Sequence, residues 1–326
     1  MVVRRVRDPR LAGLAAELAR AGLPMVALPR VARRLASRDG RVPRVLHSGE
    51  RAGQRRHCHT EFLRRDVCAG IRRGDAGSRY LLLQHGRITH GFQLTDPDHR
   101  RRITSYYGEA SGVALAIRNF PRPQKRIGVV GLGTGTTAAF GEKGDYVRIY
   151  EINAEVLRIA TNHFTFIKDT RDLGGTVDVI LGDARLSMER ELEREEPQRF
   201  DVLALDAFSS DAIPVHLLTK EAVAIYGKHL APDGVLAIHI SNRYLDLEPV
   251  VENVAKEFGY QRLSISDGEG EKDWWIYSST WVLLSKNKEL MTRIASLSET
   301  ADKDPSKKKV PLWTDDYASL LPIMSW

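Results

Sequence analysis

The chain has 326 residues, 42% of them hydrophobic and 28% charged, which is the balance of a globular protein with ample core. No uninterrupted apolar run is long enough to span a membrane, and residues 11–32 lack the pattern of a secretory signal. Two cysteines, Cys58 and Cys68, are too few for a disulfide framework, which suits a reducing compartment. We therefore expect a cytoplasmic protein without a membrane span.

The positive charge is concentrated at one end of the chain. The net charge is +7, but residues 1–73 alone carry 18 Arg against 6 acidic residues, so the rest of the chain is mildly acidic. Phe62 is the one aromatic residue of this segment, which offers no stacking surface for bases, and we expect no nucleic-acid partner. Proline and glycine interrupt the segment, so we expect residues 1–73 to be a poorly ordered, Arg-rich extension.

Residues 74–121 are predicted to form a small domain. Apolar residues over 80–83 and 88–94, separated by a turn that contains glycine, predict a β-hairpin. Residues 102–117 follow with a helical pattern. The sequence Pro-Arg-Pro at 121–123 then forms a rigid joint to the next domain.

Strand and helix patterns alternate along residues 122–290, which predicts a largely parallel sheet covered by helices. The predicted strands are 126–131, 147–151, 177–181, 200–205, 234–240, 261–266 and 275–284, and the predicted helices are 135–141, 153–164, 215–230 and 247–258. The last two strands are expected to form an antiparallel pair at one edge. The predicted fold class is therefore α/β and Rossmann-like, with a C-terminal tail at 291–326 that packs on this catalytic domain.

The strongest local pattern is a glycine loop between two apolar strands. One apolar run ends at Val130 and leads into Gly131, Gly133 and Gly135, and a second strand ends at Glu151, twenty residues after the first glycine. Glycines let a chain turn tightly and approach a ligand closely, and an acid at the next strand end can accept hydrogen bonds from a ribose. The pattern predicts a nucleoside site, although a glycine turn in an ordinary sheet would look similar. No Lys-Ser or Lys-Thr pair follows the glycines, which argues against a nucleoside triphosphate.

Four acidic residues fall at or just after predicted strand ends, namely Glu151, Asp183, Asp206 and Asp211. The carboxyl ends of parallel strands meet at one edge of the sheet, where α/β proteins bind their ligands. Each acid alone is more often a turn residue or a helix cap, but the four together indicate a site. We expect Asp183 to accept a hydrogen bond from an adenine amino group, while the Ala184 amide donates to a ring nitrogen.

Several motifs resemble the spermidine synthase family of aminopropyltransferases, over roughly residues 79–320. The motifs are 90–95 (HGFQLT), 106–109 (YYGE), the glycine loop with Glu151, 182–184 (GDA), 206–218 (DAFSSDAIPVHLL), 239–243 (HISNR) and 312–317 (LWTDDY). The resemblance implies the Rossmann-like sheet of class I S-adenosylmethionine-dependent methyltransferases, preceded by a small β domain. The chain looks closest to the bacterial branch in which such a domain is fused to a membrane transporter-like half, so it would be the soluble part alone.

The resemblance also implies roles for residues on the donor side. Gln93 and Glu151 would hold the sugar and tail of decarboxylated S-adenosylmethionine, and Asp183 would hold its adenine. The glycine loop at 131–135 would bind the same co-substrate. The resemblance implies no metal and no permanently bound cofactor.

On the acceptor side, Asp206 would orient the attacking amine and take its proton. Asp211 and Tyr107 would bind a diamine such as putrescine, and Tyr277 is a weaker match for the same role. An alkyl amine with a pKa of about 10 is mostly protonated at neutral pH, so a carboxylate beside it can attract the cation and then accept its proton. The expected function is aminopropyl transfer, and relatives of this type often form homodimers.

One position departs from the family pattern. The family usually has an acid in the place of Thr134, where it binds the aminopropyl ammonium. Losing a charge-assisted hydrogen bond costs about 1.5–3 kcal/mol, so the neutral Thr134 would weaken binding of the decarboxylated donor. Methyltransferases that use S-adenosylmethionine have loops much like this one. Two alternatives therefore stay open: a methyltransferase, and a nucleoside-binding module with little turnover.

Overall fold

The computed structural model describes residues 54–60, 65–72, 79–85, 88–207, 214–268, 273–304, 306 and 308–325. All of them belong to one structural unit, Leu46–Trp326. Up to residue 53, the predicted Arg-rich extension lies outside the described residues. In the described part of the chain, none of the helices combines the length and the apolar character that crossing a bilayer requires.

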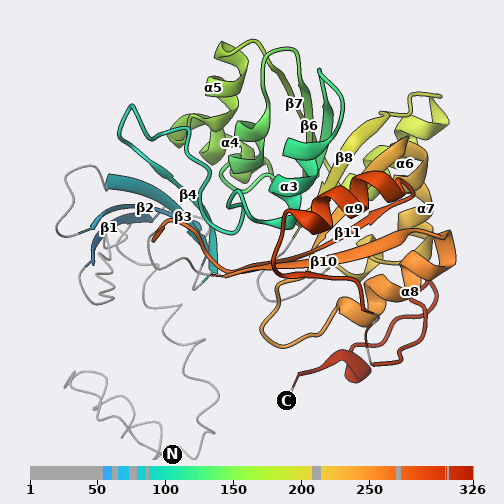
Figure 1. The fold of residues 1–326 in the computed structure, drawn as a ribbon. Coiled ribbons are helices and arrows are strands. Elements are labelled where there is room, and N and C mark those ends of the chain that lie inside the picture. The colour runs from blue at the N-terminus through green and yellow to red at the C-terminus, as the bar shows by residue number, and fades with distance from the viewer. Residues whose placement is uncertain are drawn as a thin grey trace, which may run out of the picture. The chain divides into compact units, whose positions relative to one another are not determined.

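Four strands form an antiparallel N-terminal sheet in the order β1-β2-β3-β4 (Figure 1). They are β1 (Gln54–Thr60), β2 (Arg65–Arg72), β3 (Arg79–His85) and β4 (Ile88–Leu94). The pair β3–β4 is the hairpin that the sequence predicts. Strands β1 and β2 lie within residues 1–73, which the sequence predicts to be a poorly ordered extension. Tyr80, Leu82, Phe92 and Leu94 are buried together against Trp274, which gives this sheet its own apolar core.

A larger, eight-stranded sheet follows in the order β12-β10-β11-β9-β8-β5-β6-β7. Its strands are β5 (Arg126–Val130), β6 (Tyr146–Glu151), β7 (Thr176–Leu181), β8 (Phe200–Leu205), β9 (Leu230–His239), β10 (Gln261–Asp267), β11 (Ser279–Ser285) and β12 (Ala301–Asp302). Strands β5 to β9 pair in parallel, and β11 is antiparallel to both β9 and β10. From β5 the chain builds outward through β6 and β7 and then returns to the other side of β5 with β8. Such a reversal creates a crevice at the carboxyl ends of the strands, where ligands bind.

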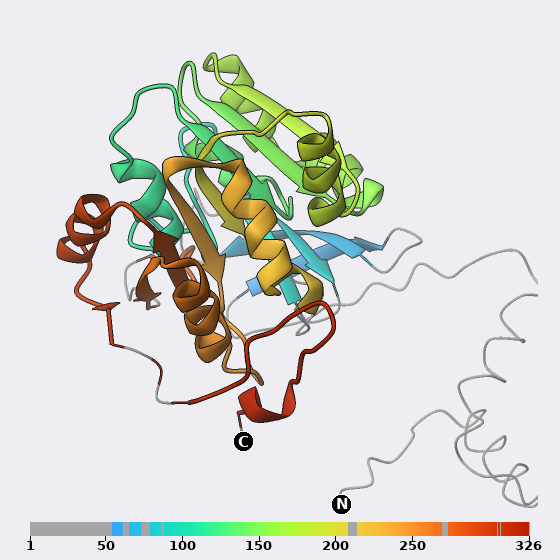
Figure 2. The ribbon, with the colours of Figure 1, turned by 90° about the vertical axis from the view of Figure 1, so that its right-hand side faces the viewer.

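Helices cover both faces of the large sheet (Figure 1, Figure 2). They are α3 (Gly112–Asn119), α4 (Ala154–His163), α5 (Phe166–Asp172), α6 (Ala184–Glu193), α7 (Lys220–His229), α8 (Glu248–Phe258) and α9 (Lys288–Ser296), with short 3-10 turns η2 (Thr136–Phe140), η3 (Val215–Leu217) and η4 (Leu321–Ile323). Successive side chains of a strand point to opposite faces, so Ile127 and Val129 join the core under α3, α5 and α9. Val130 joins the core under α6, α7 and α8. Burial on both faces explains the uninterrupted apolar run before the glycine loop.

The large sheet agrees with most of the elements that the sequence predicts. The strands predicted at 126–131 and 200–205 and the helix predicted at 153–164 form within two residues of their predicted bounds. The expected antiparallel pair is β10–β11, but β11 begins at Ser279 rather than at residue 275. The helix predicted at 135–141 is a 3-10 turn.

Two other helix predictions are wrong in their extent. Of residues 102–117, only those from Gly112 onward are helical, because Ser105 has a φ of 63° and bridges to Ile276, which holds the preceding segment in an irregular path. The helix predicted at 215–230 is divided into η3 and α7. Thr219 separates the two, since its extended backbone ends the first turn and its side chain caps α7.

Candidate active site

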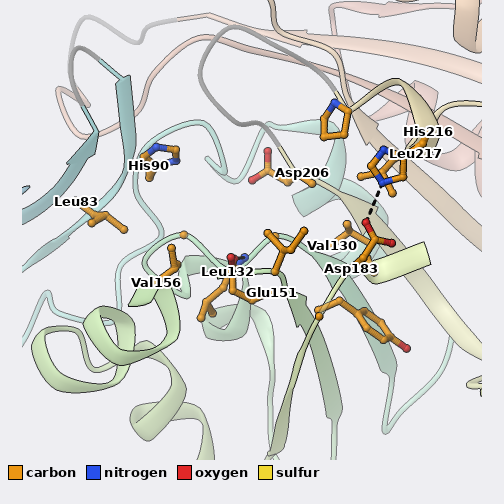
Figure 3. A pocket seen from close by; sticks show the side chains of 18 residues that line it. Leu83, His90, Val130, Leu132, Glu151, Val156, Asp183, Asp206, His216 and Leu217 are labelled. Atoms are coloured by element: carbon orange, nitrogen blue, oxygen red, sulfur yellow. Dashed lines mark hydrogen bonds and ion pairs between the residues drawn. The ribbon is translucent and has the colours of Figure 1, made fainter. Parts of the chain in front are cut away.

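A cavity of about 290 Å³ lies at the carboxyl ends of the parallel strands (Figure 3). The glycine loop, the ends of β6, β7 and β8 and the segment 214–217 line it, together with Leu83 and His90 of the N-terminal sheet. Its volume is close to the lower limit for small-molecule sites. Half of the predicted site residues line this one cavity, namely Gly131, Gly133, Glu151, Asp183, Ala184 and Asp206.

The glycine loop passes very close to two other backbone segments. Gly131 has a φ of +99°, and a Cβ there would lie 2.4 Å from the carbonyl oxygen of Asp206. Gly133 has a φ of +54°, and a Cβ there would lie 2.7 Å from the carbonyl oxygen of His90. Backbone carbonyls cannot easily give way, so both positions require glycine. The loop thereby brings the end of β8 and the N-terminal sheet together around the cavity.

Glu151 ends β6, and backbone amides hold its carboxylate. Oε2 accepts a hydrogen bond from the Leu132 amide at 3.0 Å, and Oε1 accepts one from the Asn153 amide at 2.8 Å. The residue is only 7% exposed and still lines the cavity. Because a carboxylate oxygen accepts more than one hydrogen bond, Glu151 keeps acceptor capacity for a hydroxyl group of a ligand.

Asp183 follows β7 and caps the N-terminus of α6. Its Oδ1 accepts a hydrogen bond from the Leu186 amide at 3.0 Å, and its Oδ2 lies 2.9 Å from Nε2 of His216, which points toward it in Figure 3. Burial alone would raise the pKa of the Asp183 carboxyl, but the Leu186 amide and His216 outweigh burial and lower this pKa. Asp183 is therefore an ionised acceptor at neutral pH.

Asp206 follows β8 and has side-chain partners on both carboxylate oxygens. Oδ1 lies 2.7 Å from Nδ1 of His239, and Oδ2 accepts a hydrogen bond from the hydroxyl group of Tyr107. Burial and the negative charge of Asp206 raise the pKa of the Tyr107 hydroxyl well above its usual value, so Tyr107 keeps its proton and donates it. Asp206 is thus a largely buried carboxylate in the cavity wall.

Two residues predicted to bind the donor are engaged elsewhere. Thr134 is 1% exposed, and its hydroxyl group is hydrogen-bonded to that of Thr136 at 2.8 Å. Gln93 donates to Oγ1 of Thr165 at 2.8 Å and accepts from the Thr165 amide at 2.9 Å, which ties β4 to the start of α5. Neither side chain lines the cavity, so their roles in donor binding stay predictions.

Three more predicted residues, Tyr107, Tyr277 and Gly135, are not among the described residues that line the cavity. Tyr107 donates a hydrogen bond to the lining residue Asp206. The ring centroid of Tyr277 lies 5.5 Å from that of Phe92, in the core of the N-terminal sheet. Gly135 caps η2 with a φ of 85°. Asp211 belongs to 208–213, which lies outside the described residues.

Some lining residues are not among the predicted site residues. His90 and His216 are polar, and Leu83, Ile152 and Leu217 form apolar walls. Both histidines lie in motifs that carry the family resemblance, at 90–95 and 206–218. Their places in these motifs could have indicated them as site residues. The apolar residues carry no chemical pattern, and only the fold brings them together.

Comparisons with known proteins give local sequence similarity, and no protein-family model matches the chain. A segment of 121 residues is 35% identical to the polyamine aminopropyltransferase of Vibrio vulnificus (strain CMCP6), over 36% of this chain and 37% of that protein. A segment of 112 residues is 34% identical to the N-terminal histidine N-methyltransferase of Emericella nidulans, over 34% of this chain and 19% of that protein. The chain thus spans about a third and a fifth of the length of these curated relatives.

Two solved structures are similar over most of the chain. The spermidine synthase from Thermotoga maritima matches with a TM-score of 0.43 and 13% identity, covering 81% of each chain. A probable spermidine synthase from Corynebacterium glutamicum ATCC 13032 matches with a TM-score of 0.49 and 16% identity, covering 86% of this chain and 99% of that one.

The strand order of the large sheet, with antiparallel β11 between β9 and β10, is the Rossmann-like arrangement of S-adenosylmethionine-dependent methyltransferases. This confirms the predicted fold class. The local identity to a polyamine aminopropyltransferase confirms the resemblance that the motifs indicate. By their names, both curated relatives are transferases.

Proposed function

We propose that this chain transfers an aminopropyl group from decarboxylated S-adenosylmethionine to a diamine such as putrescine. The observation that carries the proposal is the set of three carboxylates, Glu151, Asp183 and Asp206, at one small cavity. We call Glu151 and Asp183 the nucleoside end of the cavity and Asp206 its acceptor end. The similarity to a polyamine aminopropyltransferase supports the same function.

The charge of the cavity supports a cationic ligand. Three carboxylates line it, and none of the described lining residues is Lys or Arg. A sulfonium nucleoside and a protonated amine both carry positive charge and would be attracted, whereas phosphates would be repelled. Ordinary S-adenosylmethionine also carries a carboxylate, for which the described lining residues offer no Lys or Arg partner, so the decarboxylated donor fits better.

At the nucleoside end, Glu151 would accept hydrogen bonds from the ribose hydroxyls. Asp183 would accept one from the adenine amino group, and the Ala184 amide would donate to a ring nitrogen. Gly131 and Gly133 would let the backbone approach the sugar closely. Gln93, Thr134 and Gly135 would contribute indirectly. Thr134 and Gly135 would shape the glycine loop itself, and Gln93 would hold β4 beside the start of α5.

At the acceptor end, Asp206 would bind the protonated amine and take one proton from it. The freed lone pair of the nitrogen then forms a bond to the aminopropyl carbon beside the sulfonium. The carbon–sulfur bond breaks, its electron pair stays on sulfur, and a thioether nucleoside leaves. Tyr107 would hold Asp206 in place, and Asp211 and Tyr277 would contact the diamine. Positioning is the main source of rate acceleration in such a displacement.

The direct test is to incubate the full chain with decarboxylated S-adenosylmethionine and putrescine and to measure both products by mass spectrometry. We expect the thioether nucleoside and spermidine in equal amounts. Absence of both products would refute aminopropyl transfer to putrescine. If the donor still bound to the chain in that case, a nucleoside-binding module would be the better description.

A second candidate is methyl transfer from S-adenosylmethionine. Two observations favour it: the neutral, buried Thr134 offers no charge to an aminopropyl ammonium, and a third of the chain is similar to a histidine N-methyltransferase. Calorimetric titration with the two donors separates the candidates. Tighter binding of the decarboxylated donor supports aminopropyl transfer, and tighter binding of S-adenosylmethionine supports methyl transfer.

A further inference from the structure

Asp206 is the first member of a chain of hydrogen bonds that leads away from the cavity. Its Oδ1 lies 2.7 Å from Nδ1 of His239, whose Nε2 lies 2.8 Å from Oγ of Ser241. The same Oγ accepts a hydrogen bond from the Thr280 amide at 2.8 Å. These hydrogen bonds therefore join the ends of β8 and β9 to the start of β11.

The direction of each hydrogen bond in this chain follows from its two ends. A backbone amide can only donate, and an ionised carboxylate can only accept. Nδ1 of His239 must then carry the hydrogen that faces Asp206. If the imidazole is neutral, Nε2 keeps the lone pair. Ser241, which accepts from the Thr280 amide, donates its own hydrogen to that lone pair. This tautomer of His239 matches both Asp206 and Ser241.

Aromatic rings fix the plane of the His239 side chain. Its ring stacks on Tyr106 at 4.7 Å with an angle of 21° between the planes, and on Trp281 at 4.7 Å with an angle of 17°. His239 is also 6% exposed, so little room is left for another ring orientation. Packing thus fixes the plane of the ring, and the hydrogen bonds to Asp206 and Ser241 fix the side on which Nδ1 lies.

We propose that His239 is a positioning residue, which holds the Asp206 carboxylate in the orientation that receives the proton of the acceptor amine. Ser241 and the Thr280 amide select the tautomer that can do so. The proposal rests on the proposed function, because it assumes that Asp206 is the proton acceptor. Tyr107 holds the other carboxylate oxygen, so the carboxylate is fixed from two sides.

The same three residue types form the triad of serine hydrolases, but the arrangement here differs from a nucleophilic site. Ser241 is tied to a backbone amide between two strands, and it lines a second, polar cavity of about 590 Å³ rather than the one lined by Asp206. Asp206, which would be the remote member of a triad, faces the proposed substrate instead. Covalent labelling of Ser241 by a fluorophosphonate would contradict a positioning role.

The kinetic test compares two replacements of His239 in the full chain. His239→Asn keeps a side-chain N–H close to the place of Nδ1, and His239→Leu removes it. We expect His239→Leu to lower kcat about tenfold to a hundredfold, with KM for the donor changed less than twofold, and His239→Asn to recover most of the loss. Equal losses in both variants, or a kcat within twofold of wild type for His239→Leu, would overturn the proposal.

Two controls show whether each variant is folded and whether the effect is local. Binding of the thioether nucleoside, measured by calorimetry, should be unchanged in both His239 variants. Ser266→Ala removes a hydroxyl group that is hydrogen-bonded to Oγ1 of Thr280 at 3.1 Å. Ser266 lines the second cavity, as Ser241 does, but takes no part in the hydrogen bonds that link Asp206, His239, Ser241 and the Thr280 amide. This variant should have wild-type kinetics.

A second measurement does not depend on turnover. Nitrogen-15 NMR of the histidine-labelled protein, with His239→Asn used to assign the signal, reports which ring nitrogen carries the proton. We expect a protonated Nδ1 and an unprotonated Nε2 at neutral pH. A proton on Nε2 would overturn the assigned hydrogen-bond directions. If the wild type transfers no aminopropyl group, the proposed function fails and this measurement still tests the positioning of Asp206.

Discussion

The two ends of the cavity hold their carboxylates in different ways. At the nucleoside end, one oxygen of Glu151 and one of Asp183 accept hydrogen bonds from backbone amides two and three residues further along the chain. The other oxygens pair with the Leu132 amide and the His216 side chain, which are 19 and 33 residues away in sequence. At the acceptor end, Asp206 is bound by the side chains of His239 and Tyr107, which are 33 and 99 residues away in sequence. Local amides come with the strand-to-helix turn itself, whereas distant side chains reach Asp206 only when the whole fold is in place. The nucleoside end is therefore held in part by local structure, whereas both oxygens of the acceptor carboxylate depend on tertiary packing.

Asp206→Asn should have the largest effect, because it removes the proton acceptor and keeps the size of the side chain. We expect kcat for aminopropyl transfer to fall about 10²- to 10⁴-fold, with nucleoside affinity unchanged. Steady-state kinetics and calorimetry measure the two quantities. A variant with nearly normal kcat would show that Asp206 is not the base and would remove the functional contrast between the two ends.

Gly131→Ala tests the contact that joins the two ends. Its Cβ would lie 2.4 Å from the Asp206 carbonyl oxygen, and alanine is strained at a φ of +99°, so we expect the free energy of unfolding to fall by more than about 2 kcal/mol. Gly259→Ala is the matched control, since Gly259 also has a positive φ but no atom within 4 Å of the added Cβ. The control should cost about 1 kcal/mol. Equal losses in urea unfolding would show that the loop is not tightly packed on Asp206.

Asp183→Asn should affect the nucleoside end alone. Asparagine still caps α6 but presents an amide donor where the adenine amino group would donate, so we expect nucleoside affinity to fall about tenfold to a hundredfold. At saturating donor, kcat should stay within threefold of wild type. A large loss of kcat in this variant would mean that the two ends do not act separately.

Asp315→Asn should give the smallest effect, because Asp315 reaches the nucleoside end of the cavity indirectly, through its hydrogen bonds to Arg185. Arg185, next to Ala184, donates to both carboxylate oxygens of Asp315, at 2.7 and 2.5 Å, and to the carbonyl oxygen of His216 at 3.1 Å. The two hydrogen bonds from Arg185 to the Asp315 carboxylate lower the pKa of Asp315 to about 2. Since this pKa lies below that of the unfolded chain, about 3.9, the stabilisation is present at neutral pH and is lost as the pH falls from about 4 to about 2.

Asp315 is exposed, so we expect the wild type to be more stable than Asp315→Asn by less than about 1 kcal/mol at pH 7. Unfolding experiments across this pH range should show the difference shrinking toward zero near pH 2. A difference that stays constant with pH would assign the effect to packing rather than to charge.

The parts of the fold and the site that could be predicted from the sequence have local determinants. Gly131, Glu151 and Asp183 each follow an apolar strand, and parallel strands end at one edge, so their meeting at one cavity could be predicted without coordinates. The strand pattern also predicts the core of the large sheet, because alternation and burial on both faces are encoded residue by residue.

The acceptor end is harder to predict for a physical reason. Asp206 follows from its strand, but Tyr107 lies in a stretch whose apolar spacing predicts a helix, and the left-handed backbone of Ser105 prevents one there. That conformation depends on a bridge to Ile276, more than 170 residues further along the chain. Spacing within one segment carries no information about such a contact, and the same holds for the partnership of His239 with Asp206.

The N-terminal sheet has a consequence for the strength of every charge in the cavity. Leu83 and His90 form part of the wall, and the carbonyl group of His90 lies against Gly133. A shorter chain that began at residue 122 would keep all three carboxylates but would leave that side open to water. Two opposite unit charges 4 Å apart attract each other by about 1 kcal/mol in bulk water and by about 4 kcal/mol at the effective dielectric constant near a protein surface. By excluding water from that side, the small sheet lowers the local dielectric constant and so increases how strongly the carboxylates attract a cation.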